Sequence, residues 1–110
     1  MAEELTKETI QKRIGRDKPV VIDFYGSWCA PCKLFAPTFE KVSNGFKDID
    51  FAKYDVDKDD GVLAAKLEIR SVPCTIIFNN GKEIGRMFGK MGEDELRERI
   101  REALRNGIKR

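Results

Sequence analysis

The sequence of 110 residues contains no histidine, only three cysteines and no long apolar run. Without histidine, acid–base chemistry near neutral pH must depend on carboxylates, lysines or thiols. No stretch approaches the roughly eighteen consecutive apolar residues that a membrane-spanning helix needs. Residues 1–8 are polar and lack the apolar segment of a secretory signal. These absences predict a cytoplasmic protein that has no membrane partner.

The chain also lacks a strong excess of charge of either sign, with 21 basic and 19 acidic residues. Nucleic-acid binding needs a concentrated basic surface. The densest basic stretch, residues 97–105, interleaves its arginines with Glu98 and Glu102. This spacing is typical of a solvated helix face. We therefore expect no nucleic-acid partner.

Length and composition favour one domain over residues 1–110. A chain of this length has room for one hydrophobic core, and its 41% hydrophobic content is typical of a globular protein. Three cysteines is an odd count, which argues against a framework of structural disulfides. We expect a single-domain monomer whose cysteines carry chemistry or bind metal.

Hydrophobic periodicity predicts an alternation of helices and strands. Strands are expected at 20–25, 49–56, 74–78 and 83–88, and helices at 6–16, from the segment 26–32 to Asn44, at 60–67 with Asp60 as N-cap, and at 93–106 with Gly107 as stop. The Asn-Gly pair at 80–81 predicts a hairpin between the last two strands. The order is that of an α/β protein, with helices on both faces of a mixed sheet.

The candidate chemistry lies in the segment Trp28-Cys29-Ala30-Pro31-Cys32. Two intervening residues allow both sulfurs to meet across the first turn of a helix. There Cys29 faces the unpaired N–H groups and the positive end of the helix dipole, which stabilise a thiolate. Cys32, one turn further on, should be more buried and less acidic. Pro31 suits a first helical turn because its missing N–H would have no partner there.

A CxxC pair is also half of a zinc site. Zinc requires four ligands, and the chain offers only one further cysteine, Cys74, and no histidine. A carboxylate would have to complete the set, which argues against zinc, and we expect no metal. A metal or iron–sulfur carrier that uses Cys29, Cys32 and Cys74 remains an alternative.

Six stretches and their spacing carry a family resemblance. They are Val21–Tyr25, Trp28–Lys33, Pro37, Ala52–Asp57, Ile69–Pro73 and Phe78–Gly81. Through them the sequence resembles the thioredoxin family over nearly its whole length. The resemblance implies a thioredoxin fold with a central mixed four-stranded sheet, the family's first strand being short or missing. It also implies reduction of protein disulfides by exchange through Cys29 and Cys32, with no cofactor beyond that redox-active pair.

The same resemblance assigns roles to two charged residues. Asp23, inside an apolar strand, matches the family's buried aspartate behind the active site. Desolvation should raise its pKa, so that it can accept the proton of Cys32. Lys53 matches the lysine near that aspartate and would moderate its pKa. The alternatives are an aspartate satisfied by hydrogen bonds at the edge of the core and an exposed strand lysine.

A docking surface for substrates follows from the resemblance as well. Pro73 matches the proline whose preceding peptide bond is cis in this family, beside which the substrate chain pairs like an added strand. The apolar surface would consist of Trp28, Ala30, Pro31, Val72, Pro73 and Gly89. Trp28 as a plain packing residue is the alternative. The implied partners are disulfide-containing protein substrates and a thioredoxin reductase.

Two departures from the family pattern affect the site. Ala30 stands where glycine is commonest, which should tune the redox potential. Cys74 stands where threonine is usual, beside the cysteine pair if the fold is right. Cys74 is then a small packing residue, a modulatory thiol or a metal ligand. We favour modulation, which requires exposure and thiolate character.

Two other functions remain as alternatives. An oxidase or isomerase of exported proteins would want an export signal and often a histidine between the cysteines, and the sequence has neither. A non-catalytic thioredoxin-like binding subunit would keep the fold without the exchange reaction.

Overall fold

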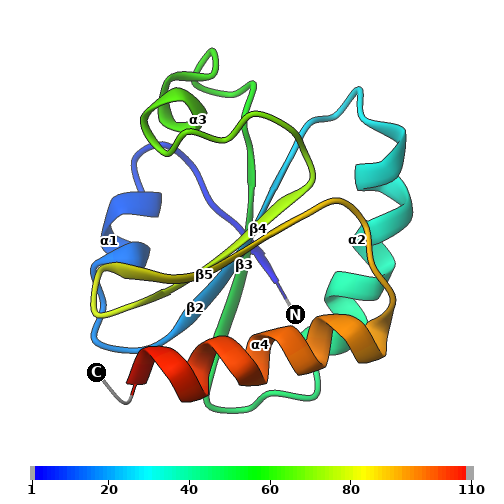
Figure 1. Cartoon of the computed structure of the whole chain (residues 1–110). Helices are drawn as coiled ribbons and strands as arrows, with labels where there is room; N and C mark the ends of the chain where they lie inside the picture. Colours follow the sequence, from blue (N-terminus) through cyan, green and yellow to red (C-terminus); the bar gives the residue numbers. More distant parts are fainter. Residues whose placement is uncertain (1, 109–110) are drawn as a thin grey trace.

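A five-stranded sheet is the centre of the structure, a computed structural model that describes residues 2–108 (Figure 1). The strands are β1 (Glu3–Glu4), β2 (Val20–Tyr25), β3 (Asp50–Asp55), β4 (Cys74–Asn79) and β5 (Lys82–Phe88), in the spatial order β1-β3-β2-β4-β5. The strands β1, β3 and β2 run parallel, whereas β4 is antiparallel to both β2 and β5. The predicted mixed α/β sheet is confirmed.

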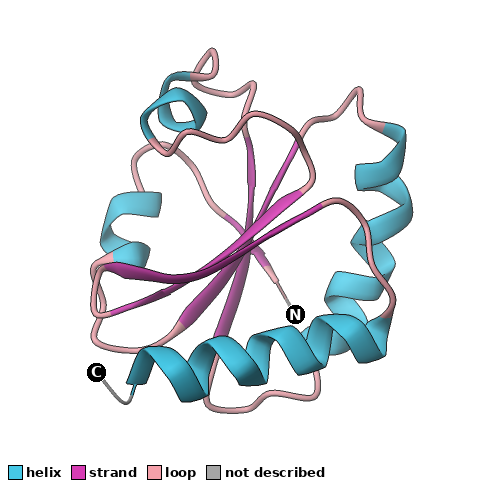
Figure 2. Ribbon diagram, in the orientation of Figure 1, coloured by secondary structure: helices cyan, strands magenta, loops and turns pink. Residues whose placement is uncertain are grey.

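Two pairs of helices cover the two faces of this sheet (Figures 1 and 2). The helices are α1 (Ile10–Ile14), α2 (Ala30–Ser43), α3 (Val62–Lys66) and α4 (Glu93–Ile108). Residues of α1 and α3 pack with one core cluster, which contains Phe24 and Tyr54, and residues of α2 and α4 with the other, which contains Phe35 and Ile100. Because successive strand residues point to opposite faces, Val20, Ile22 and Phe24 of β2 enter the first cluster and Val21 the second.

The strand β1 raises the expected four strands to five, and its two residues are the short form of the family's first strand that the sequence predicted. Its two residues pair in parallel with Ala52 and Lys53 of β3, and the N–H of Leu5 extends the pairing to the carbonyl of Lys53 at 2.8 Å. Ala2 and Leu5 on either side are buried. A strand of two residues is too short to show an alternation of hydrophobicity in the sequence. Its formation depends on pairing with β3.

Two helix starts differ from the predictions at 6 and 60. Thr6 and Thr9 exchange reciprocal hydrogen bonds between their side chains and backbone N–H groups, at 2.9 and 3.2 Å, before the regular part of α1. At α3 the N-cap is Gly61 and not Asp60. The side chain that accepts a backbone N–H of this helix is that of Asp59, whose Oδ2 lies 3.1 Å from the nitrogen of Leu63. Asp60 is exposed with a φ of 57°, and its predicted capping role is wrong.

Helix α4 continues through Gly107, which was the predicted stop. The glycine serves close packing: a Cβ there would lie 2.6 Å from the Cβ of Ile84 on β5. Gly85 does the same from the strand side, since its Cβ would lie 2.7 Å from that of Ala103. Real Cβ atoms do not approach so closely, so both glycines allow α4 to lie directly against β5.

Candidate active site

The cysteine pair lies where β2 passes into α2. Cys29 is the N-cap of α2 and forms a disulfide with Cys32, with their Cα atoms 5.2 Å apart. The N–H of Cys32 donates to Cys29 Sγ at 3.2 Å. The same N–H and the positive end of the helix stabilise negative charge on this sulfur in the reduced state.

The surface around Cys29 is open although both cysteines are buried. Ala30 and Pro31 are exposed, and Trp28 is 68% exposed. The indole Nε1 of Trp28 donates to Asp57 Oδ2 at 2.6 Å, which holds the edge of the ring to the segment after β3. A Cβ on Gly26 would lie 2.8 Å from this ring, so glycine there allows the ring its position. Trp28 thus lies at the surface and belongs to neither core cluster.

A second segment, residues 72–73, is distant in the sequence but lies beside the cysteines. The carbonyl oxygen of Val72 lies 3.6 Å from Cys29 Sγ, and the Val72–Pro73 peptide bond is cis, the form that the resemblance implies. The N–H of Gly89 donates to the carbonyl of Pro73 at 2.8 Å. The structure thus brings Val72, Pro73 and Gly89 together beside the disulfide.

Two exposed apolar side chains on these elements were missed by the sequence analysis. Leu34, in the first turns of α2, is 66% exposed, and Phe88, next to Gly89 at the end of β5, is 53% exposed. The helical period of Phe35 and Phe39 places Leu34 on the outer side of α2. That period was the available signal for Leu34, whereas the exposure of Phe88 depends on the packed structure.

Asp23 lies on the face of the sheet that α2 covers and is 3% exposed. Burial raises the pKa of its carboxyl to about 7; the positive charge of Lys53 opposes this rise and the negative charge of Glu4 adds to it. Lys53 is the register neighbour of Asp23 on β3. Asp23, Lys53 and Cys32 line one cavity of about 250 Å³. The cavity places a carboxyl with a pKa near neutral next to Cys32.

The expectation that Cys74 lies beside the cysteine pair as a modulatory thiol is wrong. Strand alternation places its side chain in the core cluster with Phe24 and Ile76, on the face opposite α2. The thiol has no exposed surface, and burial raises its pKa to about 11. Modulation requires exposure and thiolate character, and Cys74 has neither. It is a small apolar packing residue.

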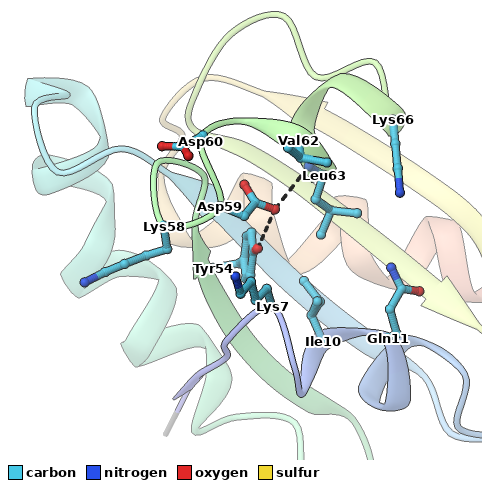
Figure 3. Close-up of a pocket in the computed structure, with 10 residues that line it drawn as sticks. All are labelled: Lys7, Ile10, Gln11, Tyr54, Lys58, Asp59, Asp60, Val62, Leu63 and Lys66. Atoms are coloured by element: carbon cyan, nitrogen blue, oxygen red, sulfur yellow. Dashed lines mark hydrogen bonds between the residues drawn. The ribbon is translucent and has the colours of Figure 1, made fainter.

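A hollow of about 450 Å³ lies away from the cysteines, between α1, α3 and residues 58–60 (Figure 3). At its floor the hydroxyl of Tyr54 donates to Asp59 Oδ2 at 2.7 Å, the oxygen that also accepts the N–H of Leu63 in α3. Burial opposes the charge of Asp59, but these hydrogen bonds outweigh it and lower the pKa of the carboxyl. These contacts connect β3 to α3. They lie outside the redox site at Cys29 and Cys32.

An oxidisable cysteine pair at a helix N-terminus, with a cis-proline segment beside it on a mixed α/β sheet, defines the class of thiol–disulfide oxidoreductases. The sequence model of the Thioredoxin family matches residues 1–102. The chain is 43% identical over 84 residues to Thioredoxin-1 of Saccharomyces cerevisiae, covering 76% of this chain and 81% of the yeast protein. It is 38% identical over 95 residues to the thioredoxin of Mycoplasmoides gallisepticum, covering 86% and 94% of the two chains.

The chain belongs to the thioredoxin family. It is a thiol–disulfide oxidoreductase that reduces protein disulfides through Cys29 and Cys32. A chloroplastic relative, Thioredoxin F-type of Spinacia oleracea, is 39% identical over 103 residues, which cover 91% of this chain and 53% of that protein. Across residues 2–108, no helix has the length and apolarity to cross a membrane.

Proposed function

We propose that Cys29 is the attacking thiol and Cys32 the resolving thiol of a cytoplasmic protein-disulfide reductase. The observation that carries this order is the position of Cys29 at the N-cap of α2, where its sulfur accepts the N–H of Cys32. Such a position lowers the pKa of a cysteine. Cys32 lies within the first turn, behind Cys29 and next to the cavity of Asp23.

The exchange runs in two steps. The Cys29 thiolate attacks one sulfur of the substrate disulfide, and the other substrate sulfur leaves as a thiolate that takes a proton from water. Cys32 then gives its proton to Asp23 and attacks Cys29 Sγ, which releases the second substrate sulfur. Two electrons pass from the dithiol to the substrate, and the Cys29–Cys32 disulfide remains.

In this proposal Asp23 is the proton acceptor and Lys53 adjusts its acidity. A general base works best when its pKa lies near the working pH, and burial raises the pKa of Asp23 to about 7. The positive charge of Lys53 opposes that rise. Lys53 therefore keeps the carboxylate populated at neutral pH.

The substrate chain docks on the residues around Cys29, of which Trp28, Ala30 and Pro31 are exposed. Trp28, Ala30 and Pro31 supply one side of this surface, and Val72, Pro73 and Gly89 supply the other. The backbone beside Pro73 pairs with an extended substrate segment, as in strand addition. Pairing of this kind places the substrate disulfide against Cys29 Sγ, since the carbonyl of Val72 lies 3.6 Å from that sulfur.

The dithiol must be restored after each cycle. A thioredoxin reductase with electrons from NADPH or ferredoxin is the proposed donor, and the protein acts as a monomer in electron transport and redox homeostasis of the cytoplasm. The named thioredoxins among its relatives support the reductase partner. One such relative carries a chloroplastic name, so localisation by fractionation of the source cells is the direct test of the compartment.

Insulin reduction and substrate trapping test the order of the two thiols. Cys29→Ser should abolish insulin reduction and capture nothing, because the attacking sulfur is gone. Cys32→Ser should hold substrates on Cys29 as stable mixed disulfides, visible on a resin and released by dithiothreitol. Capture by the Cys29→Ser protein and not by the Cys32→Ser protein would reverse the assignment. The double serine variant is the matched control for non-covalent retention.

A further inference from the structure

Two buried oxygen atoms on neighbouring strands have no hydrogen-bond partner within residues 2–108. They are Oδ1 of Asp23 on β2 and Oγ1 of Thr75 on β4. The side chains are 3% and 1% exposed, so bulk water does not satisfy either atom. Buried polar atoms in folded proteins nearly always find a partner, and each of these therefore needs one.

The sheet places these two residues directly opposite each other. Asp23 and Thr75 are register partners of the antiparallel pair β2 and β4. Such partners project from the same face of the sheet with Cβ atoms roughly 4.5–5.5 Å apart. Rotation about χ1 moves the threonine hydroxyl between staggered positions, and from this separation it reaches the carboxyl within hydrogen-bond distance.

Packing alone does not explain a threonine at this position. The side chains that follow along β4 on both faces, Ile76, Ile77 and Phe78, are apolar and buried. Valine has the shape of threonine without the hydroxyl and would fill the same space. The hydroxyl is therefore the feature that distinguishes Thr75, and the group opposite it is the carboxyl of Asp23.

We propose that Thr75 is a positioning residue for Asp23: its hydroxyl donates a hydrogen bond to the carboxylate, fixes its orientation beside Cys32 and stabilises its charged form. The proposal deepens the proposed role of Asp23 as proton acceptor and rests on it. A donor to the charged form favours that form. Thr75 thus acts from β4 in the same direction as Lys53 acts from β3, on the two sides of β2.

The other polar groups around Asp23 are titratable, and they differ from Thr75 in their charge or in the sign of their effect on the carboxylate. They are Glu4 on β1, Tyr25 on β2, Lys53 on β3, Cys32 and Lys33 on α2, and Cys74 on the far face of β4. Only the lysines are cations, and Glu4 disfavours the carboxylate. Thr75 is the register partner of Asp23 on β4 and its hydroxyl carries no charge. Salt therefore weakens the effect of the lysines and not that of Thr75.

Thr75→Val removes the hydroxyl and keeps the shape, and Thr75→Ser keeps the hydroxyl. The first measurement is the titration of the Asp23 carboxyl by carbon NMR in the oxidised protein, with Asp23→Asn to assign the signal. We expect the valine variant to raise the midpoint by roughly one pH unit, because a hydrogen bond to the carboxylate is lost. The serine variant should restore the wild-type midpoint.

The second measurement is the pH profile of insulin reduction. In Thr75→Val the midpoint of the acidic limb should move to higher pH by the same roughly one pH unit. Well below the midpoint this shift is a loss of roughly tenfold in rate. A midpoint that stays constant or falls in Thr75→Val, or one that Thr75→Ser does not restore, would overturn the proposal. If Thr75→Val unfolds, Thr75→Ala against Thr75→Ser supplies the same comparison. An acidic limb with the same midpoint in Asp23→Asn as in the parent would instead refute the proton-acceptor role, because that limb would then belong to the Cys29 thiol alone; the NMR midpoint would still report the hydrogen bond.

Discussion

Replacement of Asp23 by asparagine should stabilise the oxidised protein at pH 8 and leave its stability at pH 4 almost unchanged. The buried carboxyl has its pKa raised from 3.8 to about 7 in the folded protein. Well below pH 3.8 both the folded and the unfolded states hold the proton, and at pH 4 the cost of burial through this group is still small. Between pH 4 and 7 the unfolded chain binds fewer protons than the folded one, and stability falls as pH rises.

The size of the effect follows from the difference of about three pH units between the two states. At about 1.4 kcal/mol for each unit, the charged carboxyl costs the folded protein about 4 kcal/mol above pH 7. Asparagine removes the charge but keeps polar atoms that still want partners, so 4 kcal/mol is the upper bound of the gain. A domain of this length changes its melting temperature by about 4 °C for each kcal/mol. The variant should melt several degrees, and at most about 16 °C, above the parent at pH 8.

Thermal melts of both oxidised proteins by circular dichroism at pH 4, 6 and 8 measure this dependence. Asp60→Asn, which removes the same charge from an exposed side chain, is the matched control. The same melting difference at every pH, or a variant that melts below the parent at pH 8, would refute the buried-charge argument. A stabilised variant that reduces insulin at the parental rate would keep the argument but remove Asp23 from the mechanism.

Three further substitutions test other parts of the structure. Cys74→Val should keep insulin reduction and parental sensitivity to oxidised glutathione, because the thiol is fully buried; glutathionylation of Cys74 before activity is lost, seen by mass spectrometry, would contradict this. Gly85→Ala should lower the free energy of unfolding by about 1–3 kcal/mol in denaturant titrations, because the added Cβ would lie 2.7 Å from the Cβ of Ala103. An unchanged midpoint would show that α4 moves aside without cost. Trp28→Ala should lower kcat/KM for insulin far more than stability, as exposed positions usually change stability by about 0.5 kcal/mol or less; equal losses in both would make Trp28 a structural residue.

Local sequence determined the parts of this protein that depend on neighbours along the chain. The spacing of Cys29 and Cys32 before an amphipathic run is enough to place two sulfurs across a first helical turn, and the helix forms there. The β-branched runs at 20–25 and 74–78 likewise became β2 and β4 almost residue for residue. In each case the periodicity of a short segment decides its conformation, because hydrogen bonds and packing direction repeat within it.

Tertiary structure decided the features that depend on strand register and on burial between distant segments. The contact between Val72 and Cys29 joins residues 43 positions apart, and β1 exists only because β3 presents free backbone groups to it. Register places Thr75 opposite Asp23 and turns Cys74 to the other face, away from the cysteine pair. A one-residue change of register would exchange these two side chains between the faces. Register is set by the packing of the whole sheet against its helices, so no local pattern around residue 74 predicts it.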